Sequence, residues 1–208
     1  MKLLSGNEKI NCGGKDTGKT LLDFWQWNSS DLLNNTLRGA FAEFIVSSAL
    51  DVDTTETHID WEAYDIHGNN GERIEVKCSA YLQSWFPKDN PNRLSNIVFS
   101  ISPALEWLPD ECKYKPNSCK RHSDLYVFCH YKSKERLPEN PLDMNNWDFY
   151  VLATYKIDEI FGERKSLPLN ILIKRAEPIL CDYDGLKKAV AKEYADHKKH
   201  LQGENNNG

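Results

Sequence analysis

The chain has 208 residues, 40% of them hydrophobic and 11% aromatic, which is enough apolar material for one folded domain and excludes a wholly disordered protein. Its 26 basic and 31 acidic residues give a formal charge of −5, which excludes a globally basic nucleic-acid binder. No run approaches the ~18 consecutive apolar residues of a membrane helix, and the opening residues lack the apolar stretch of a signal peptide. We therefore expect a cytoplasmic protein without membrane contact.

The first 18 residues are polar and contain several glycines, so they predict a flexible N-terminal segment ahead of a single domain over 19–200. Residues 13–20 (GGKDTGKT) satisfy the phosphate-binding pattern G-x₄-G-K-[ST]. That pattern requires a buried strand before it and a helix after it, and residues 8–12 make a poor buried strand. A nucleotide hydrolase is therefore only a third hypothesis for this chain.

The periodicity of apolar residues predicts two helices between about 20 and 50, the second from Thr36 to Leu50 with one side formed by Leu37, Phe41, Phe44, Ile45 and Ser48. Residues 57–67 and 73–79 predict two strands around a turn-rich loop at 68–72. Later elements are strands over Ile97–Ser102, Leu125–Tyr131 and Trp147–Tyr155, an irregular stretch over 103–123, a helix over 184–200 and a disordered tail over 201–208. This order favours an α/β fold with a mixed sheet covered by helices.

The candidate functional residues lie on the hairpin predicted around residues 68–72. If its loop is symmetric about Asn70, opposed residues have numbers that sum to 140, so Asp65 faces Glu75. Two carboxylates side by side repel each other, and a cation between them relieves the repulsion. Mg²⁺ is the natural candidate because it prefers oxygen ligands and is held by one or two carboxylates with water and substrate phosphate.

Strand alternation places Lys77 on the same face as Glu75, while Ile74, Val76 and Cys78 point to the opposite, apolar face. An ammonium beside two metal-bound carboxylates is able to orient a water or stabilise charge on a phosphate. The alternative for this face is a solvated hairpin in which the lysine only relieves the two acids.

These residues resemble the PD-(D/E)XK nuclease superfamily, in which an Asp is followed by a Glu-x-Lys triplet at the end of a hairpin. Residues 36–85 carry the resemblance, and Glu43 matches the acidic residue of the superfamily's first core helix. The resemblance implies a three-layer α/β/α, restriction-endonuclease-like fold with a central mixed β-sheet. Tyr64 stands where the superfamily often has proline. Considered without the other site residues, Glu43 is also explained as part of a solvent-exposed polar stripe on the helix, formed by Thr36, Gly39, Glu43 and Ser47.

The same resemblance implies the roles of the site residues. Asp65 and Glu75, with the Val76 carbonyl, would ligate Mg²⁺, for which Mn²⁺ would substitute; Glu43 would bind a second ion or a metal-bound water, and Lys77 would position the nucleophile. The implied function is hydrolysis of a nucleic-acid phosphodiester bond, with DNA as the favoured substrate, by an endonuclease.

Candidate substrate contacts come from two places. Ser79 and Gln83 follow Lys77 on its side of the strand, and residues 113–136 hold seven basic side chains against two acidic ones. The basic candidates for phosphate contact are Lys120, Arg121, Lys132 and Lys134.

Other functions remain open to the sequence. The main alternative is a non-catalytic nucleic-acid-binding or assembly protein on the same scaffold. The sequence also leaves open a homodimer, which in a nuclease would allow both strands to be cut. The irregularly spaced cysteines predict reduced thiols. A zinc site is disfavoured because no C-x₂-C pair occurs among Cys112, Cys119, His122, Cys129 and His130.

Overall fold

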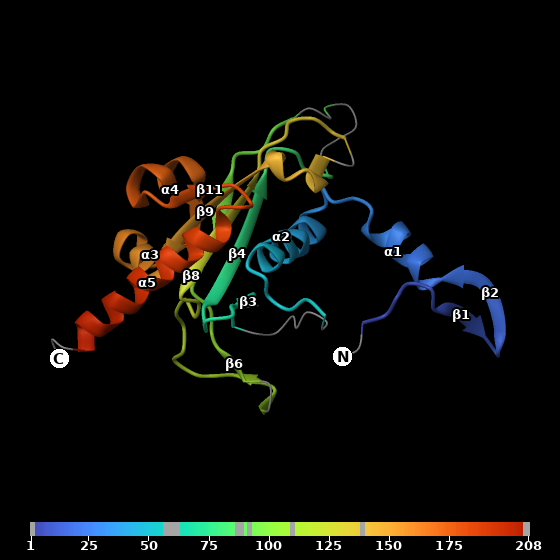
Figure 1. The fold of residues 1–208 in the computed structure, drawn as a ribbon, viewed down its shortest axis with the longest axis horizontal. Coiled ribbons are helices and arrows are strands. Elements are labelled where there is room, and N and C mark those ends of the chain that lie inside the picture. Colours follow the sequence, from blue (N-terminus) through green and yellow to red (C-terminus); the bar gives the residue numbers. More distant parts are fainter. Residues whose placement is uncertain are drawn as a thin grey trace.

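The computed structural model describes residues 3–55, 63–85, 90, 93–108, 111–137 and 140–205, and its centre is a five-stranded sheet (Figure 1). The strand order is β11-β9-β8-β4-β3, with bounds Ile179–Cys181, Trp147–Ala153, Leu125–Tyr131, Arg73–Ala80 and Ile66–His67. The β4–β8 pair is parallel and the other pairs are antiparallel. The α/β class and the mixed sheet are therefore confirmed, and the restriction-endonuclease-like layering stays a prediction.

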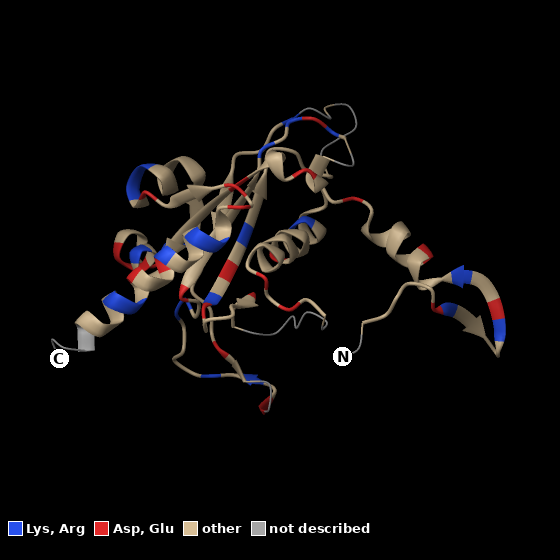
Figure 2. Ribbon diagram, viewed as in Figure 1, with Lys and Arg blue, Asp and Glu red and all other residues tan. Residues whose placement is uncertain are grey.

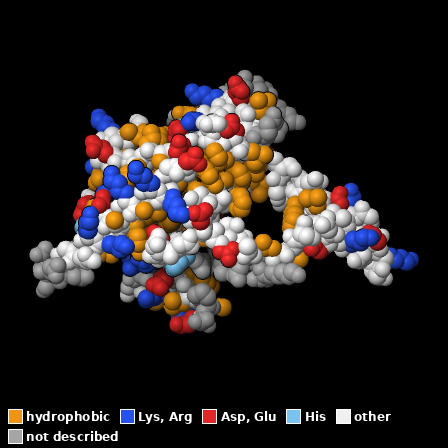
Figure 3. Space-filling model, viewed as in Figure 1, with side chains coloured by type: hydrophobic (Ala, Val, Ile, Leu, Met, Phe, Trp, Pro, Cys, Tyr) orange, Lys and Arg blue, Asp and Glu red, His pale blue; other side chains and the backbone are white. Residues whose placement is uncertain are grey.

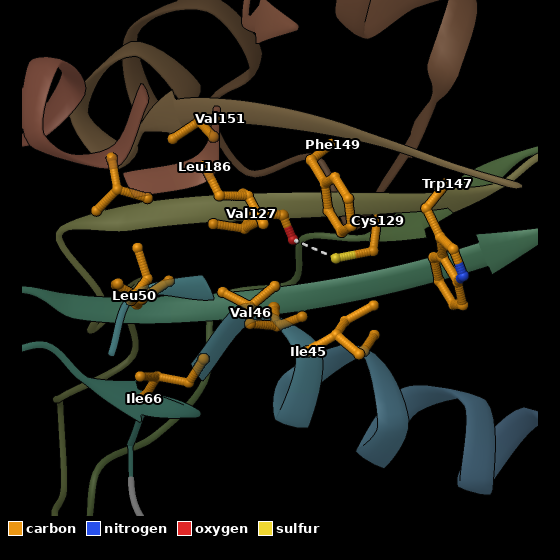
Figure 4. Close-up of a cluster of buried hydrophobic side chains, with 14 of the residues drawn as sticks. Ile45, Val46, Leu50, Ile66, Val127, Cys129, Trp147, Phe149, Val151 and Leu186 are labelled. Atoms are coloured by element: carbon orange, nitrogen blue, oxygen red, sulfur yellow. Dashed lines mark hydrogen bonds between the residues drawn. The ribbon is translucent and has the colours of Figure 1, made fainter. Parts of the chain in front are cut away.

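Side chains of the sheet alternate between two apolar clusters. One face holds Val76, Val127 and Val151, covered by α2 (Asn35–Ala49) and α5 (Leu186–Asn205) (Figure 4). The other face holds Tyr126, Phe128, Tyr150 and Leu152, which pack against α3 (Thr154–Phe161), α4 (Leu169–Ala176) and a separate pair of strands, β5 (Val98–Ser100) and β10 (Ser166–Pro168). Packing on both faces explains why β8 is buried at every position and carries apolar or aromatic side chains at nearly all of them rather than alternating with polar ones.

The N-terminal segment contains a hairpin where the sequence predicted flexibility. Strands β1 (Lys9–Cys12) and β2 (Lys15–Thr20) are joined by Gly13 and Gly14, whose φ angles of 57° and 79° suit a two-residue turn of the type that needs left-handed backbone. The residues that match the phosphate-binding pattern thus form a turn and an antiparallel strand. That arrangement lacks the strand, loop and helix order on which phosphate binding depends. A helix, α1 (Leu21–Ser29), follows.

Other differences from the predicted elements are local. Residues 63–65 bend, so only the end of the 57–67 strand forms β3, and residues 57–62 of that prediction lie outside the described part. Helix α5 continues to Asn205, which replaces most of the tail predicted over 201–208. The 103–123 stretch contains a short hairpin of β6 (Trp107–Leu108) and β7 (Lys113–Tyr114), and two turns of 3₁₀ helix, η2 (Asn140–Leu142) and η3 (Met144–Asn146), precede β9. Every described helix is too short or too polar to span a membrane.

Candidate active site

The β3–β4 hairpin has the register that its sequence predicted. Ile66 pairs with Ile74 and His67 with Arg73, so opposed numbers sum to 140. At the next pair the ladder changes: Asp65 donates its N–H to the Ile74 carbonyl at 3.0 Å, and its carboxylate accepts the Val76 N–H at 2.7 Å. The Asp65 carboxylate therefore accepts the β4 hydrogen bond that the backbone carbonyl of a further β3 residue would otherwise accept.

Lys77 connects the two predicted carboxylates. Its Nζ lies 3.9 Å from Asp65 Oδ2 and forms a close ion pair with Glu75 Oε1. The side chains of Lys77, Asp65 and Glu75 are 28%, 24% and 19% exposed, so all three are partly dehydrated yet still reachable by solvent. Figure 2 shows the acidic and basic positions as successive red and blue bands on β4.

Burial and charge shift the pKa values of this group. Burial is the largest influence on the pKa of Glu75 and raises it; Lys77 lowers it and Asp65 raises it, and the net shift is upward. Burial is also the largest single influence on the pKa of Lys77 and lowers it. The charges of Glu75, Asp65 and Glu43 together outweigh burial, so the pKa of Lys77 is raised and its ammonium is protonated at neutral pH.

Glu43 joins the site through its charge. It lies on α2, which packs against the Val76 face of β4, whereas Lys77 projects from the other face. Among the four charged residues predicted for the site, three are in direct contact, and Glu43 contributes from the neighbouring helix to the raised pKa of Lys77.

A family model described as bacteriophage T4 endonuclease IV matches residues 3–164, which is more than three quarters of the chain. The chain belongs to the bacteriophage T4 endonuclease IV family. It is therefore a nuclease, and the matched span contains Glu43, Asp65, Glu75 and Lys77. A search of curated proteins gives no match.

Two further residues approach the site of this T4 endonuclease IV family member. Tyr126 is the register partner of Glu75 across the parallel β4–β8 pair; burial and then the Glu75 charge raise the pKa of its phenol. His122 lies before β8, where its ring bonds to the Ala104 carbonyl at 2.9 Å and its charge lowers the pKa of Glu75. The sequence offered no signal for either, because it does not show which strand pairs with β4.

The site offers a divalent cation two carboxylates and one carbonyl. Asp65 and Glu75 both lie within ion-pair distance of one ammonium, so a single cation is able to span them. The Val76 N–H faces Asp65, and the carbonyl of the same strand residue points to the same side. This donor set, completed by water and phosphate, suits Mg²⁺.

The structure brings fewer candidate metal ligands together than the sequence suggested. Among the described residues, no three His, Cys, Asp or Glu side chains gather closely enough to hold a metal ion by themselves. Glu43 therefore does not form a three-carboxylate cluster with Asp65 and Glu75, and its role toward a second ion or a metal-bound water stays a prediction. The cysteine and histidine set of 112–130 is not gathered into a zinc site. Cys129 lies in the core, which separates it from exposed Cys112 and Cys119.

Three of the predicted substrate contacts are structural instead. Ser79 is buried and its hydroxyl accepts the Val98 N–H at 3.2 Å. Gln83 is buried between the Arg38 guanidinium, at 3.3 Å, and the Ala80 carbonyl, at 2.9 Å. The side chain of Arg121 is 2% exposed and bonds to Asp158 and to backbone carbonyls at 2.8–2.9 Å. These three predictions are corrected, because each side chain already uses its polar atoms within the fold.

The remaining basic candidates lie at opposite ends of β8. Lys120 precedes the strand, and Lys132 and Lys134 follow it, so the seven strand residues separate them by roughly 20 Å. Lys132 is paired with Asp148 at 2.6 Å. The segment 113–136 is thus not one basic patch; Lys120 and Lys134 are exposed cations on either side of the acidic site along the strand direction.

A cavity of about 540 Å³ opens beyond the carboxyl end of β4. Tyr81 lines it four residues after Lys77, about 13 Å along an extended chain, and Lys134 Nζ lies 5.0 Å from the Tyr81 ring centroid. The polar lining is Ser95, Asn96 and Asn170. An aromatic ring, amides and a nearby cation make this cavity suitable for a nucleotide.

Proposed function

We propose that this nuclease is a metal-dependent endonuclease that hydrolyses DNA phosphodiester bonds with the chemistry of the PD-(D/E)XK superfamily. The observation that carries the proposal is the position of the Lys77 ammonium within ion-pair distance of both the Asp65 and Glu75 carboxylates. Family membership supports a nuclease with DNA as its substrate.

Each residue has a distinct part in this proposal. Asp65 and Glu75, with the Val76 carbonyl, hold the divalent cation, and the Val76 N–H fixes the Asp65 carboxylate in place. A bound divalent cation supplies Lewis-acid polarisation of the phosphate oxygens. Because its raised pKa keeps it protonated, Lys77 donates hydrogen bonds to the scissile phosphate or to the attacking water, and does not act as the base.

The DNA strand passes along β4 in this proposal. Lys120 and Lys134 contact phosphates at the two ends of the path, and the cavity beside Tyr81 receives a nucleotide that flanks the cleaved bond. Glu43 stabilises the protonated form of Lys77 from α2.

The test is a cleavage assay with plasmid, single-stranded and double-stranded DNA and RNA oligonucleotides, in Mg²⁺, Mn²⁺ or EDTA. We expect cleavage of DNA with either metal and none with EDTA. Asp65→Asn should abolish cleavage, while Asp184→Asn, at an exposed position, should not. Metal-independent cutting, or an active Asp65→Asn variant, would contradict the proposal; DNA binding without any cutting would favour a binding protein on this scaffold.

The proposed DNA path also predicts a change in salt dependence. Lys120→Ala and Lys134→Ala should each weaken DNA binding and reduce the slope of log Kd against log salt concentration by about 1, because each removes one phosphate contact. Lys188→Ala is the control, since it is exposed on α5, which covers the other face of the sheet. Fluorescence anisotropy over a salt series measures the slope. An unchanged slope would remove that lysine from the path.

A further inference from the structure

The N-terminal residues 3–29 form an arm that projects from the body of the molecule (Figure 1). The arm consists of the β1–β2 hairpin and α1, joined by bonds from the Leu21 and Leu22 N–H groups to carbonyls of residues 8 and 6. Every residue of α1 is at least partly exposed, and its apolar side chains include Trp27 at 82% exposure and Phe24 at 45%. An exposed apolar surface of this kind marks a site of interaction with another molecule.

A second apolar surface lies on the body and is formed by α2 and η2; we call it the α2–η2 face. Phe44 of α2 is 54% exposed and Leu142 of η2 is 61% exposed. The two elements are linked beneath this surface: Phe41 packs against both Phe44 and the buried Trp147, and the Trp147 Nε1–H donates to the carbonyl of residue 141. Figure 3 shows hydrophobic side chains over α2 and on the arm, separated by a gap.

The connection between arm and body keeps α1 away from the α2–η2 face of its own chain. Only residues 30–33 separate α1 from Asn34, the N-cap of α2. Leu33 is buried, its N–H bonds to the Asp31 carboxylate at 3.0 Å, and its carbonyl accepts a bond from the buried Arg38 at 2.8 Å. This short, bonded connection leaves α1 directed away from the body of its own chain (Figure 1).

The charge of the arm favours a protein partner over nucleic acid. Residues 3–29 contain three lysines and three acidic residues, so their net charge is zero. Lys9 pairs with Asp16 at 2.6 Å and Lys19 with Asp23 at 3.6 Å, which neutralises the positive groups that phosphate binding would use.

We propose that two copies of this chain form a dimer in which the arm of each copy docks on the α2–η2 face of the other. Phe24 and Trp27 are the anchors from the arm, and Phe44 and Leu142 receive them. The exchange is reciprocal, as in other two-fold interfaces, and covers both apolar surfaces of both chains. It does not depend on the metal or on the chemistry proposed for the active site.

Sedimentation and light scattering over a concentration series test the dimer. We expect the wild-type chain to have twice the chain mass and the double variant Phe24→Ser/Trp27→Ser to be a folded monomer, because these side chains support no core. Leu180→Ser is the matched control: Leu180 is 59% exposed on β11, outside both surfaces, and its variant should stay dimeric. A monomeric wild-type chain, or a dimer that survives the double variant, would overturn the proposal.

A mixing experiment separates exchange between chains from docking within one chain. Phe44→Ser/Leu142→Ser should also be monomeric. Mixed with the arm variant, it should form a heterodimer of reduced stability, because one intact arm then meets one intact α2–η2 face. If the mixture stays monomeric, the arm does not dock on a second copy.

Discussion

Lys77→Ala is expected to lower the rate of DNA cleavage by about 10²- to 10³-fold at neutral pH, the effect of removing one positioned donor that stabilises charge in a transition state. The variant should fold, because Lys77 is 28% exposed and lies outside both apolar clusters. DNA binding should fall much less than the rate, since the ammonium is one of several cations near the strand. Single-turnover cleavage with excess enzyme measures the chemical step separately from binding.

The pH profile distinguishes this role from simple loss of structure. Glu75 must be ionised to hold a cation, and its pKa is raised, so cleavage should fall as the pH drops toward that raised pKa. Lys77 lowers the pKa of Glu75, and its removal should move the acid limb of the profile to higher pH. Lys77→Arg keeps the positive charge and should leave the acid limb in place. An acid limb unchanged in Lys77→Ala would contradict the assigned pairing.

Asp124→Ala is expected to lower the free energy of unfolding by about 2–4 kcal/mol, because it leaves the half-exposed Arg73 and the buried His197 without the carboxylate that they contact. Asp124 precedes β8; its side chain is 7% exposed and accepts bonds from the Arg73 N–H at 3.0 Å and from the Arg73 guanidinium. His197 of α5 lies 3.4 Å away on the other side. The partial exposure of Arg73, at 47%, places the expected loss below that of a fully buried pair.

The lowered pKa of Asp124 determines how its contribution to the free energy of unfolding changes with pH. Arg73 and His197 hold the pKa of Asp124 well below its ordinary value even though burial, the largest influence, raises it. A lowered pKa in the folded state stabilises the protein above the unfolded pKa of about 3.9, and this contribution is lost as the pH falls below it. The difference in stability between wild type and Asp124→Ala should thus be full at pH 7 and shrink below about pH 4.

Urea unfolding at several pH values measures both effects. Glu111→Ala is the control, because it removes one partner of an exposed ion pair with Lys113 and should cost less than about 1 kcal/mol. If the two variants lose equal stability, Asp124 does not connect β4, β8 and α5 in the way its contacts indicate.

The hairpin of the candidate site was predictable because its information is local. Nine residues separate Asp65 from Glu75, the turn composition sets the register, and strand alternation places Lys77. What the sequence could not show is the pairing of β4 with β8, which brings Tyr126 beside Glu75 from 51 positions further along the chain. Periodicity carries no information about which distant strand is the neighbour.

The same limit explains the corrected contacts. Ser79, Gln83 and Arg121 are polar residues at positions that suit substrate contact in an isolated strand or loop. In the fold, strand β5, the Arg38 guanidinium and the carbonyls after α3 use their polar atoms. The hairpin of the N-terminal arm was missed because its strands are exposed at every position before Thr20 and thus lack the alternating pattern from which strands are predicted.

The parallel β4–β8 pair has a consequence for the order of folding. A parallel pair needs a long crossover, and here residues 81–124 must be closed into a loop before the first bond of the ladder forms. The acidic hairpin is able to form early from local contacts, but its low-dielectric surroundings arrive only with β8. A growing chain on the ribosome therefore carries the Glu75 carboxylate without the burial that raises its pKa until β8 emerges.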